Sequence, residues 1–95
     1  MYKAVWKDTI IAKSDKTIEI ERNHYFPPDS VKWEHLRPSL ATSVCPWKGL
    51  AHYYDVTLGD DMSKDAAWTY PEPKAAALQI KDYVAFWQDV KVIAE

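Results

Sequence analysis

Residues with useful chemistry concentrate in the segment Cys45-Pro46-Trp47-Lys48-Gly49, where the chain's single cysteine stands three residues before a lysine. A lysine close to a thiol increases the fraction of reactive thiolate, so Cys45 is a candidate nucleophile. Free cysteine is also among the most buried residue types, so an inert, buried Cys45 beside a solvated Lys48 is the bland alternative. The segment therefore predicts either a binding or reactive site, or a structural turn.

A thiol nucleophile needs a base, and His24, His35 and His52 show no spacing that selects one of them for this role. The cysteine and the histidines also lack the CxxC or HxxxH spacing of metal ligands, so we expect no metal site. The two glycines stand ten residues apart, which excludes the glycine-rich loops that bind phosphates. Asp60 and Asp61 fit a polar hairpin tip better than a magnesium site. No cofactor is identified.

Aromatic residues make up 14% of the chain, with five Trp, six Tyr and two Phe. Large rings supply the buried area that a small domain needs for its core, and they also line ligand pockets. In Ala67-Trp68-Thr69-Tyr70-Pro71 the two large rings share one face of a predicted strand. This pattern favours a core position for Trp68 and leaves Tyr70 open, because its hydroxyl needs a polar partner.

The elements expected to position these residues are mostly short strands. Thr17 to Glu21 alternates apolar and acidic residues, and residues 51–58 alternate again, as half-buried strands do. A short helical turn is expected near Val31, capped by Asp29 or Ser30. Further strands are expected at residues 3–6, 9–13, 66–70, 83–87 and 90–93, a hairpin turn at Lys7 and Asp8, and a helix at 74–80. We therefore predict one domain, residues 1–95, mainly β, as a compact antiparallel roll or barrel-like sheet with one or two helical turns.

Composition excludes several classes of protein. The net charge is −2 with a pI near 5.9, and the charges are spread evenly, so binding to nucleic acid through its phosphates is not expected. One cysteine cannot form an internal disulfide. The first twenty residues lack the features of a signal peptide, and no apolar run is long enough to span a membrane. We expect a soluble, cytoplasmic domain that contacts neither nucleic acid nor membrane.

Several of these segments together resemble the domain of unknown function 427 family, which is also labelled a nucleotidyltransferase family. The resemblance spans nearly the whole chain, and its most specific elements are Cys45 to Gly49 and Ala67 to Pro71. It implies a compact β-rich domain similar to the Mss4-like β-folds, without their zinc cysteines. Nucleotidyltransferases usually present a Gly-Ser or Gly-Gly turn followed by spaced aspartates, a pattern absent here, so no catalytic role passes to Asp60 or Asp61.

The leading hypothesis is a small-molecule-binding β-domain, with or without catalysis, whose pocket lies at the Cys45–Gly49 turn. Lys48 would hold a small anionic ligand, Cys45 would be a polar or nucleophilic contact, and Glu21 would act as a hydrogen-bond acceptor or base. Tyr25, Trp47, Trp68 and Tyr70 would form the aromatic walls. The alternative is a monomeric or homodimeric interaction module without enzymatic activity, which would use exposed rings such as Trp33, Trp47 or Trp87.

Overall fold

The computed structural model describes residues 1–95 and contains three open antiparallel sheets with short 3-10 turns between them. The four-stranded sheet has the order β5-β6-β7-β8, the three-stranded sheet β2-β1-β9, and β3 pairs with β4. The strands are β1 (Tyr2–Trp6), β2 (Thr9–Ser14), β3 (Ile18–Ile20), β4 (Asn23–Tyr25), β5 (Leu36–Cys45), β6 (Gly49–Leu58), β7 (Asp61–Thr69), β8 (Val84–Phe86) and β9 (Lys91–Ala94). The 3-10 turns are η1 (Pro28–Ser30), η2 (Trp33–His35) and η3 (Ala75–Ile80).

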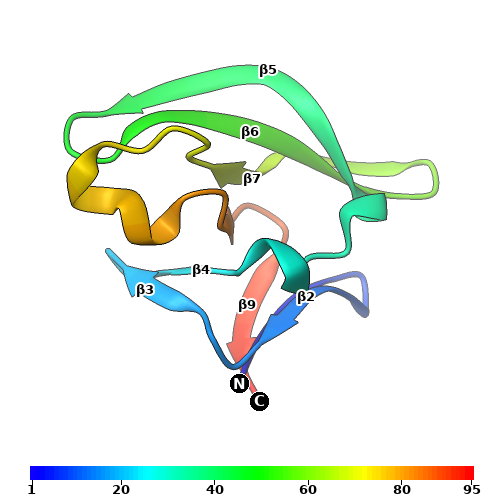
Figure 1. Ribbon diagram of the computed structural model, residues 1–95. Coiled ribbons are helices and arrows are strands. Elements are labelled where there is room, and N and C mark those ends of the chain that lie inside the picture. Colours follow the sequence, from blue (N-terminus) through cyan, green and yellow to red (C-terminus); the bar gives the residue numbers. More distant parts are fainter.

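The long strands β5, β6 and β7 lie on one side of the molecule, opposite the sheet that carries both termini (Figure 1). The two ends of the chain meet there, where the backbone N–H of Glu95 donates to the carbonyl of Met1 at 2.8 Å. The β3–β4 hairpin joins the larger sheet through Phe26, whose backbone exchanges two hydrogen bonds with Val84 in β8. No helix in the structure has the length and apolar character needed to cross a membrane.

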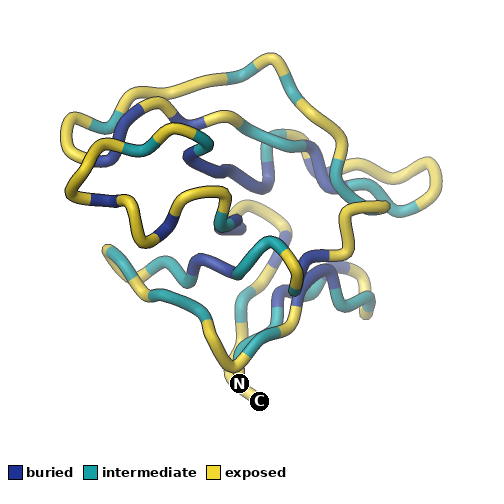
Figure 2. Tube along the Cα trace, in the orientation of Figure 1, coloured by how far each residue is buried: buried dark blue, intermediate teal, exposed yellow.

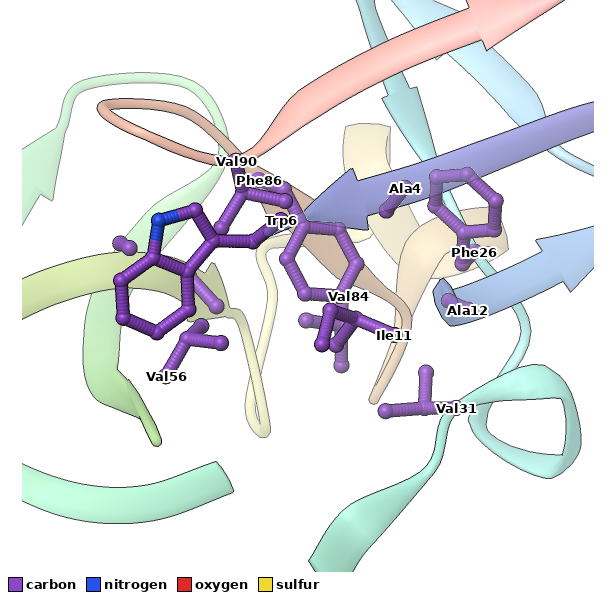
Figure 3. Packing of buried hydrophobic residues seen from close by; sticks show 12 residues of the cluster. Ala4, Trp6, Ile11, Ala12, Phe26, Val31, Val56, Val84, Phe86 and Val90 are labelled. Atoms are coloured by element: carbon purple, nitrogen blue, oxygen red, sulfur yellow. The ribbon is translucent and has the colours of Figure 1, made fainter. Parts of the chain in front are cut away.

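The core is divided by the four-stranded sheet, because β7 is buried on both of its faces. Ala67 belongs to the larger apolar cluster, whereas its neighbour Trp68 belongs to a smaller one built around Tyr25. Figure 3 shows the larger cluster, in which Trp6, Phe26 and Phe86 meet in one apolar interior. Successive side chains of a strand point to opposite faces, so a strand with both faces covered can serve two separate environments.

The mainly β, antiparallel prediction is confirmed, and the sheets stay open rather than closing into a barrel. The predicted helical turn near Val31 is wrong in detail, because Val31 is extended and separates two 3-10 turns, η1 and η2. The predicted helix at residues 74–80 is a 3-10 turn, interrupted by a non-helical backbone at Ala77. Strand β5 was not predicted; it is an edge strand with no buried residue, and it is exposed along most of its length (Figure 2).

Candidate functional site

The central feature of the candidate site is an ion pair between two hairpin turns. Lys48 ends the turn between β5 and β6 and is only 6% exposed, and its ammonium donates a hydrogen bond to the carboxylate of Glu21. Glu21 and Arg22 form the two-residue turn between β3 and β4, and both have positive φ, 54° and 68°. Left-handed backbone costs about 1–2 kcal/mol at a residue other than glycine. Such strain is concentrated at sites where the surrounding structure holds the chain in place.

Gly49 follows Lys48 and lets the backbone pass close to the segment at residues 72–74. Its φ is +117°, and a Cβ built there would lie 3.4 Å from both the carbonyl oxygen of Glu72 and the backbone nitrogen of Lys74. That segment holds the turn in place, because the N–H of Lys74 donates to the carbonyl of Lys48 at 2.9 Å and its side chain donates to the carbonyl of Pro46 at 2.7 Å. Close approach and positive φ together explain the glycine at this position.

The hydroxyl group of the buried Tyr25 is a second partner of the Lys48 ammonium. The hydroxyl oxygen of Tyr25, a residue with no exposed surface, lies 3.5 Å from Nζ of Lys48 and accepts the indole N–H of Trp68 at 3.2 Å. Nζ also lies 5.5 Å from the ring centroids of Trp47 and Tyr70, and 5.9 Å from that of Tyr25, within the range of cation–π attraction. The ammonium is therefore enclosed by one carboxylate and three aromatic rings.

Beside this ammonium lies a cleft of about 240 Å³. Three of its walls are the rings of Tyr53, Trp68 and Trp87, which contact one another with centroid separations between 5.7 and 6.5 Å. Lys48 is the only charged residue that lines it. The complete lining is Asn23, Lys48, Tyr53, Trp68, Tyr70 and Trp87.

The ionisation of the site is set by burial and by the ion pair. Burial lowers the pKa of Lys48, but the hydrogen bond to Glu21 and the neighbouring tyrosines outweigh that effect, so the pKa is raised overall. The hydrogen bond and the charge of Lys48 lower the pKa of Glu21. Burial, reinforced by Tyr25, raises the pKa of Tyr70 to about 12, although the Lys48 ammonium opposes the shift. Near neutral pH the site therefore holds an ammonium, a carboxylate and a neutral Tyr70 phenol.

Six of the seven predicted site residues lie close together around the Lys48 ammonium. Glu21, Tyr25, Trp47 and Tyr70 contact Lys48 directly, and Trp68 joins them through its hydrogen bond to Tyr25.

Cys45, the seventh, does not line the cleft and instead packs, half-buried, against the smaller apolar cluster. It pairs with Gly49 at the base of the turn that carries Lys48, on the cluster that contains Tyr25 and Tyr70. In any hairpin the two residues that flank the turn face each other, and the turn residues, here including Lys48, extend beyond them.

Sequence reasoning missed Asn23, Tyr53 and Trp87 as lining residues. The alternation of residues 51–58 placed Tyr53 opposite Tyr54, and the structure confirms that these two pack against different clusters. Trp87 gives no local signal, because it follows β8 and reaches the cleft only through the pairing of β8 with β7. The three exposed tryptophans lie in two places: Trp47 and Trp87 lie near Lys48, whereas Trp33 packs against Tyr54.

No three side chains of His, Cys, Asp or Glu gather closely enough to ligate a metal ion. Among curated proteins, no match to this chain was found. Among protein families, one matches residues 1–95, the whole chain, and its description is Domain of unknown function (DUF427). Together with the Cys45–Gly49 turn and the Ala67–Pro71 strand, this match establishes that the chain belongs to the DUF427 family.

Proposed function

We propose that the cleft beside Lys48 binds a small planar molecule that carries a carboxylate or phosphate group. The observation that carries this proposal is a nearly buried ammonium on the wall of an open cleft whose other walls are mainly aromatic. Pockets that recognise small molecules combine apolar and aromatic walls with a few polar groups that fix orientation. Here the rings would stack on the ligand and Lys48 would orient it.

Counting hydrogen-bond donors supports this assignment. A lysine ammonium has three N–H donors, of which Glu21 accepts one and Tyr25, at 3.5 Å, weakly accepts another. The third remains for a ligand in the cleft that Lys48 lines. Hydrogen bonds between charged groups are the strong ones, so an anionic group gains most from this donor.

The size of the cleft limits the ligand. At about 240 Å³ it is smaller than the roughly 300–1,000 Å³ of pockets that enclose drug-sized molecules. One ring with one anionic substituent fits this space, and the contacting rings of Tyr53, Trp68 and Trp87 offer it an apolar surface.

The ionisation states favour binding over acid–base catalysis. A lysine whose pKa is raised keeps its proton, so Lys48 is a fixed cation and neither a nucleophile nor a base. Tyr70, with a pKa of about 12, keeps its proton as well. A general acid or base works best when its pKa lies near the working pH, and neither residue meets that condition.

Calorimetric titration with benzoate and phenyl phosphate tests the proposal, with neutral benzamide as the matched probe. We expect saturable binding of the two anions, at least about ten-fold weaker in Lys48→Met because a charged hydrogen bond is lost. The control Lys64→Met removes an exposed lysine outside the cleft and keeps wild-type affinity. Equal affinity of Lys48→Met and wild type, or equal binding of benzamide, contradicts the proposal.

The variant Glu21→Gln gives a second test, in which binding at Lys48 should become tighter rather than weaker. The substitution keeps a hydrogen-bond acceptor but removes the negative charge that competes with the ligand for Lys48. We expect benzoate to bind about three- to ten-fold more tightly, because a neutral amide competes less strongly than a carboxylate for the Lys48 ammonium. Trp87→Leu, which removes an exposed ring of the cleft, should weaken binding even if Lys48→Met fails to fold.

A further inference from the structure

A second cleft, of about 370 Å³, lies on the other face of β7. Its residues come from four separate segments: the 3-10 turns η1 and η2, strand β6, the end of β7 with Pro71 just after it, and the short connection before β8. Thr69 stands between Trp68 and Tyr70 on β7, so its side chain points away from the Lys48 cleft. The lining consists of Pro28, Trp33, Tyr54, Thr69, Pro71 and Asp82.

Thr69 gives this cleft an unused polar group. Its side chain is 4% exposed, and its Oγ1 is the one buried side-chain oxygen or nitrogen in the protein without a hydrogen-bond partner. Burying a hydroxyl without a partner costs about 1–3 kcal/mol, so native proteins rarely leave one unsatisfied. A ligand that donates to Oγ1 would recover this cost.

Asp82 gives the cleft its charge. It is the only charged residue in the lining, and its exposed carboxylate forms no ion pair and no side-chain hydrogen bond within the chain. Its φ is 63°, a conformation that only aspartate, asparagine and glycine adopt readily. Burial raises the pKa of Tyr54, and the charge of Asp82 adds to that shift.

Two aromatic rings complete the recognition surface. Trp33 and Tyr54 contact edge to face, with their centroids 5.6 Å apart. The indole N–H of Trp33 donates to the carbonyl of Pro28 at 2.9 Å, which fixes a ring that is still 41% exposed. Tryptophan and tyrosine faces attract cations, most strongly where water is partly excluded.

We propose that this second cleft binds an organic ammonium group, with Asp82 as its counter-ion, Thr69 Oγ1 as an acceptor and the rings of Trp33 and Tyr54 as walls. An ammonium supplies what each group lacks: positive charge for Asp82, an N–H donor for Thr69, and a cation for the rings. The site is independent of the Lys48 cleft, because the two share no lining residue. The ammonium belongs to a free amine or to a lysine side chain of another protein.

Calorimetric titration with benzylammonium tests the proposal, and benzyl alcohol is the neutral probe of the same shape. We expect benzylammonium alone to bind saturably, at least about ten-fold more weakly to Asp82→Asn. Asparagine tolerates the left-handed backbone, so this variant should fold. Thr69→Val and Trp33→Leu should each weaken binding about three-fold or more. Asp60→Asn changes an exposed turn residue outside the cleft and should leave affinity unchanged.

A capped tripeptide with lysine at its centre separates the two sources of the ammonium. Tighter binding of the peptide than of benzylammonium assigns the cleft to a lysine side chain of a protein, and the reverse order assigns it to a free amine. The proposal is overturned if neither probe binds saturably, or if Asp82→Asn and Asp60→Asn bind benzylammonium alike.

Discussion

On one face of β7, the Lys48 ammonium has Glu21 and Tyr25 as partners, whereas on the other face the side chains of the buried Thr69 and the exposed Asp82 have none within the chain. Both faces carry a cleft with aromatic walls, and the charges that line the clefts are opposite in sign. The satisfied network around Lys48 fixes the turn that presents it. The buried Oγ1 of Thr69, which has no partner, lowers stability, and such departures from full hydrogen bonding are common at functional sites.

The largest expected effect comes from the turn that presents Lys48. Gly49→Ala should destabilise the protein by about 2–3 kcal/mol, because alanine rarely adopts a φ of +117° and its Cβ would press against the backbone of residues 72–74. Gly59→Ala is the matched control, since its φ is also positive at +59° but open space surrounds it. It should cost only about 1 kcal/mol.

Urea unfolding measures both glycine variants. If the two cost the same, the segment at residues 72–74 does not hold the turn as described. A comparison of ligand binding sharpens the result, because Gly49→Ala should weaken benzoate binding at Lys48 and leave benzylammonium binding at Asp82 unchanged.

Removing one hydroxyl from each face should have opposite effects on stability. Tyr25→Phe leaves the indole N–H of Trp68 and one donor of Lys48 without an acceptor, and it should destabilise by about 1–2 kcal/mol. Thr69→Val removes an oxygen that has no partner and nearly preserves shape, so it should be neutral or stabilising by up to about 1 kcal/mol. Denaturant midpoints at neutral pH measure both.

The two hydroxyl variants also separate stability from binding. Thr69→Val should keep or raise stability while it weakens benzylammonium binding, a combination that a purely structural threonine would not produce. A destabilised Thr69→Val would mean that Oγ1 is satisfied in solution, and the contrast between the faces would be lost.

Tyrosine ionisation compares the electrostatic fields of the two clefts. Burial raises the pKa of Tyr54 and of Tyr70, but Asp82 adds to the shift of Tyr54 whereas Lys48 opposes that of Tyr70. We therefore expect Asp82→Asn to lower the pKa of Tyr54, and Lys48→Met to raise that of Tyr70 further. A titration of the tyrosine ring carbons by NMR checks both directions, and shifts of the same sign would contradict opposite fields.

The raised pKa of Tyr70 also affects the stability of the protein at high pH. The folded protein holds the proton of Tyr70 up to a pKa of about 12, while an unfolded chain releases it near its ordinary value of about 10. The unfolded state therefore binds fewer protons in this range, and the free energy of unfolding falls as the pH rises through it. Tyr70→Phe should make that fall shallower.

Much of the fold could be predicted from the sequence. The alternation of side chains at residues 51–58 and 67–70, for example, correctly assigns them to opposite faces of the sheet. Strand β5 was missed because an exposed edge strand has no buried face to impose alternation, and Pro38 interrupts its pattern. The helix expected at residues 74–80 rested on alanine propensity, which tertiary packing overrode.

The residues around Lys48 were easier to group from the sequence than those of the second cleft. They cluster in recognisable motifs, although the pairing of Lys48 with Glu21, 27 residues away, follows only from how the two hairpins meet. The second cleft depends on one threonine without a partner and on residues from four segments. Whether a buried hydroxyl has a hydrogen-bond partner depends on its neighbours in the folded protein, so a sequence pattern does not predict it.

The most direct test of two opposite clefts is an NMR titration that follows the indole N–H signals of the five tryptophans. Benzoate should move the signals of Trp68 and Trp87, which line the Lys48 cleft, and leave that of Trp33 in place. Benzylammonium should move the signal of Trp33 alone. If both probes move the same set of signals, or neither probe moves any, the two faces of β7 do not carry clefts that select ligands of opposite charge.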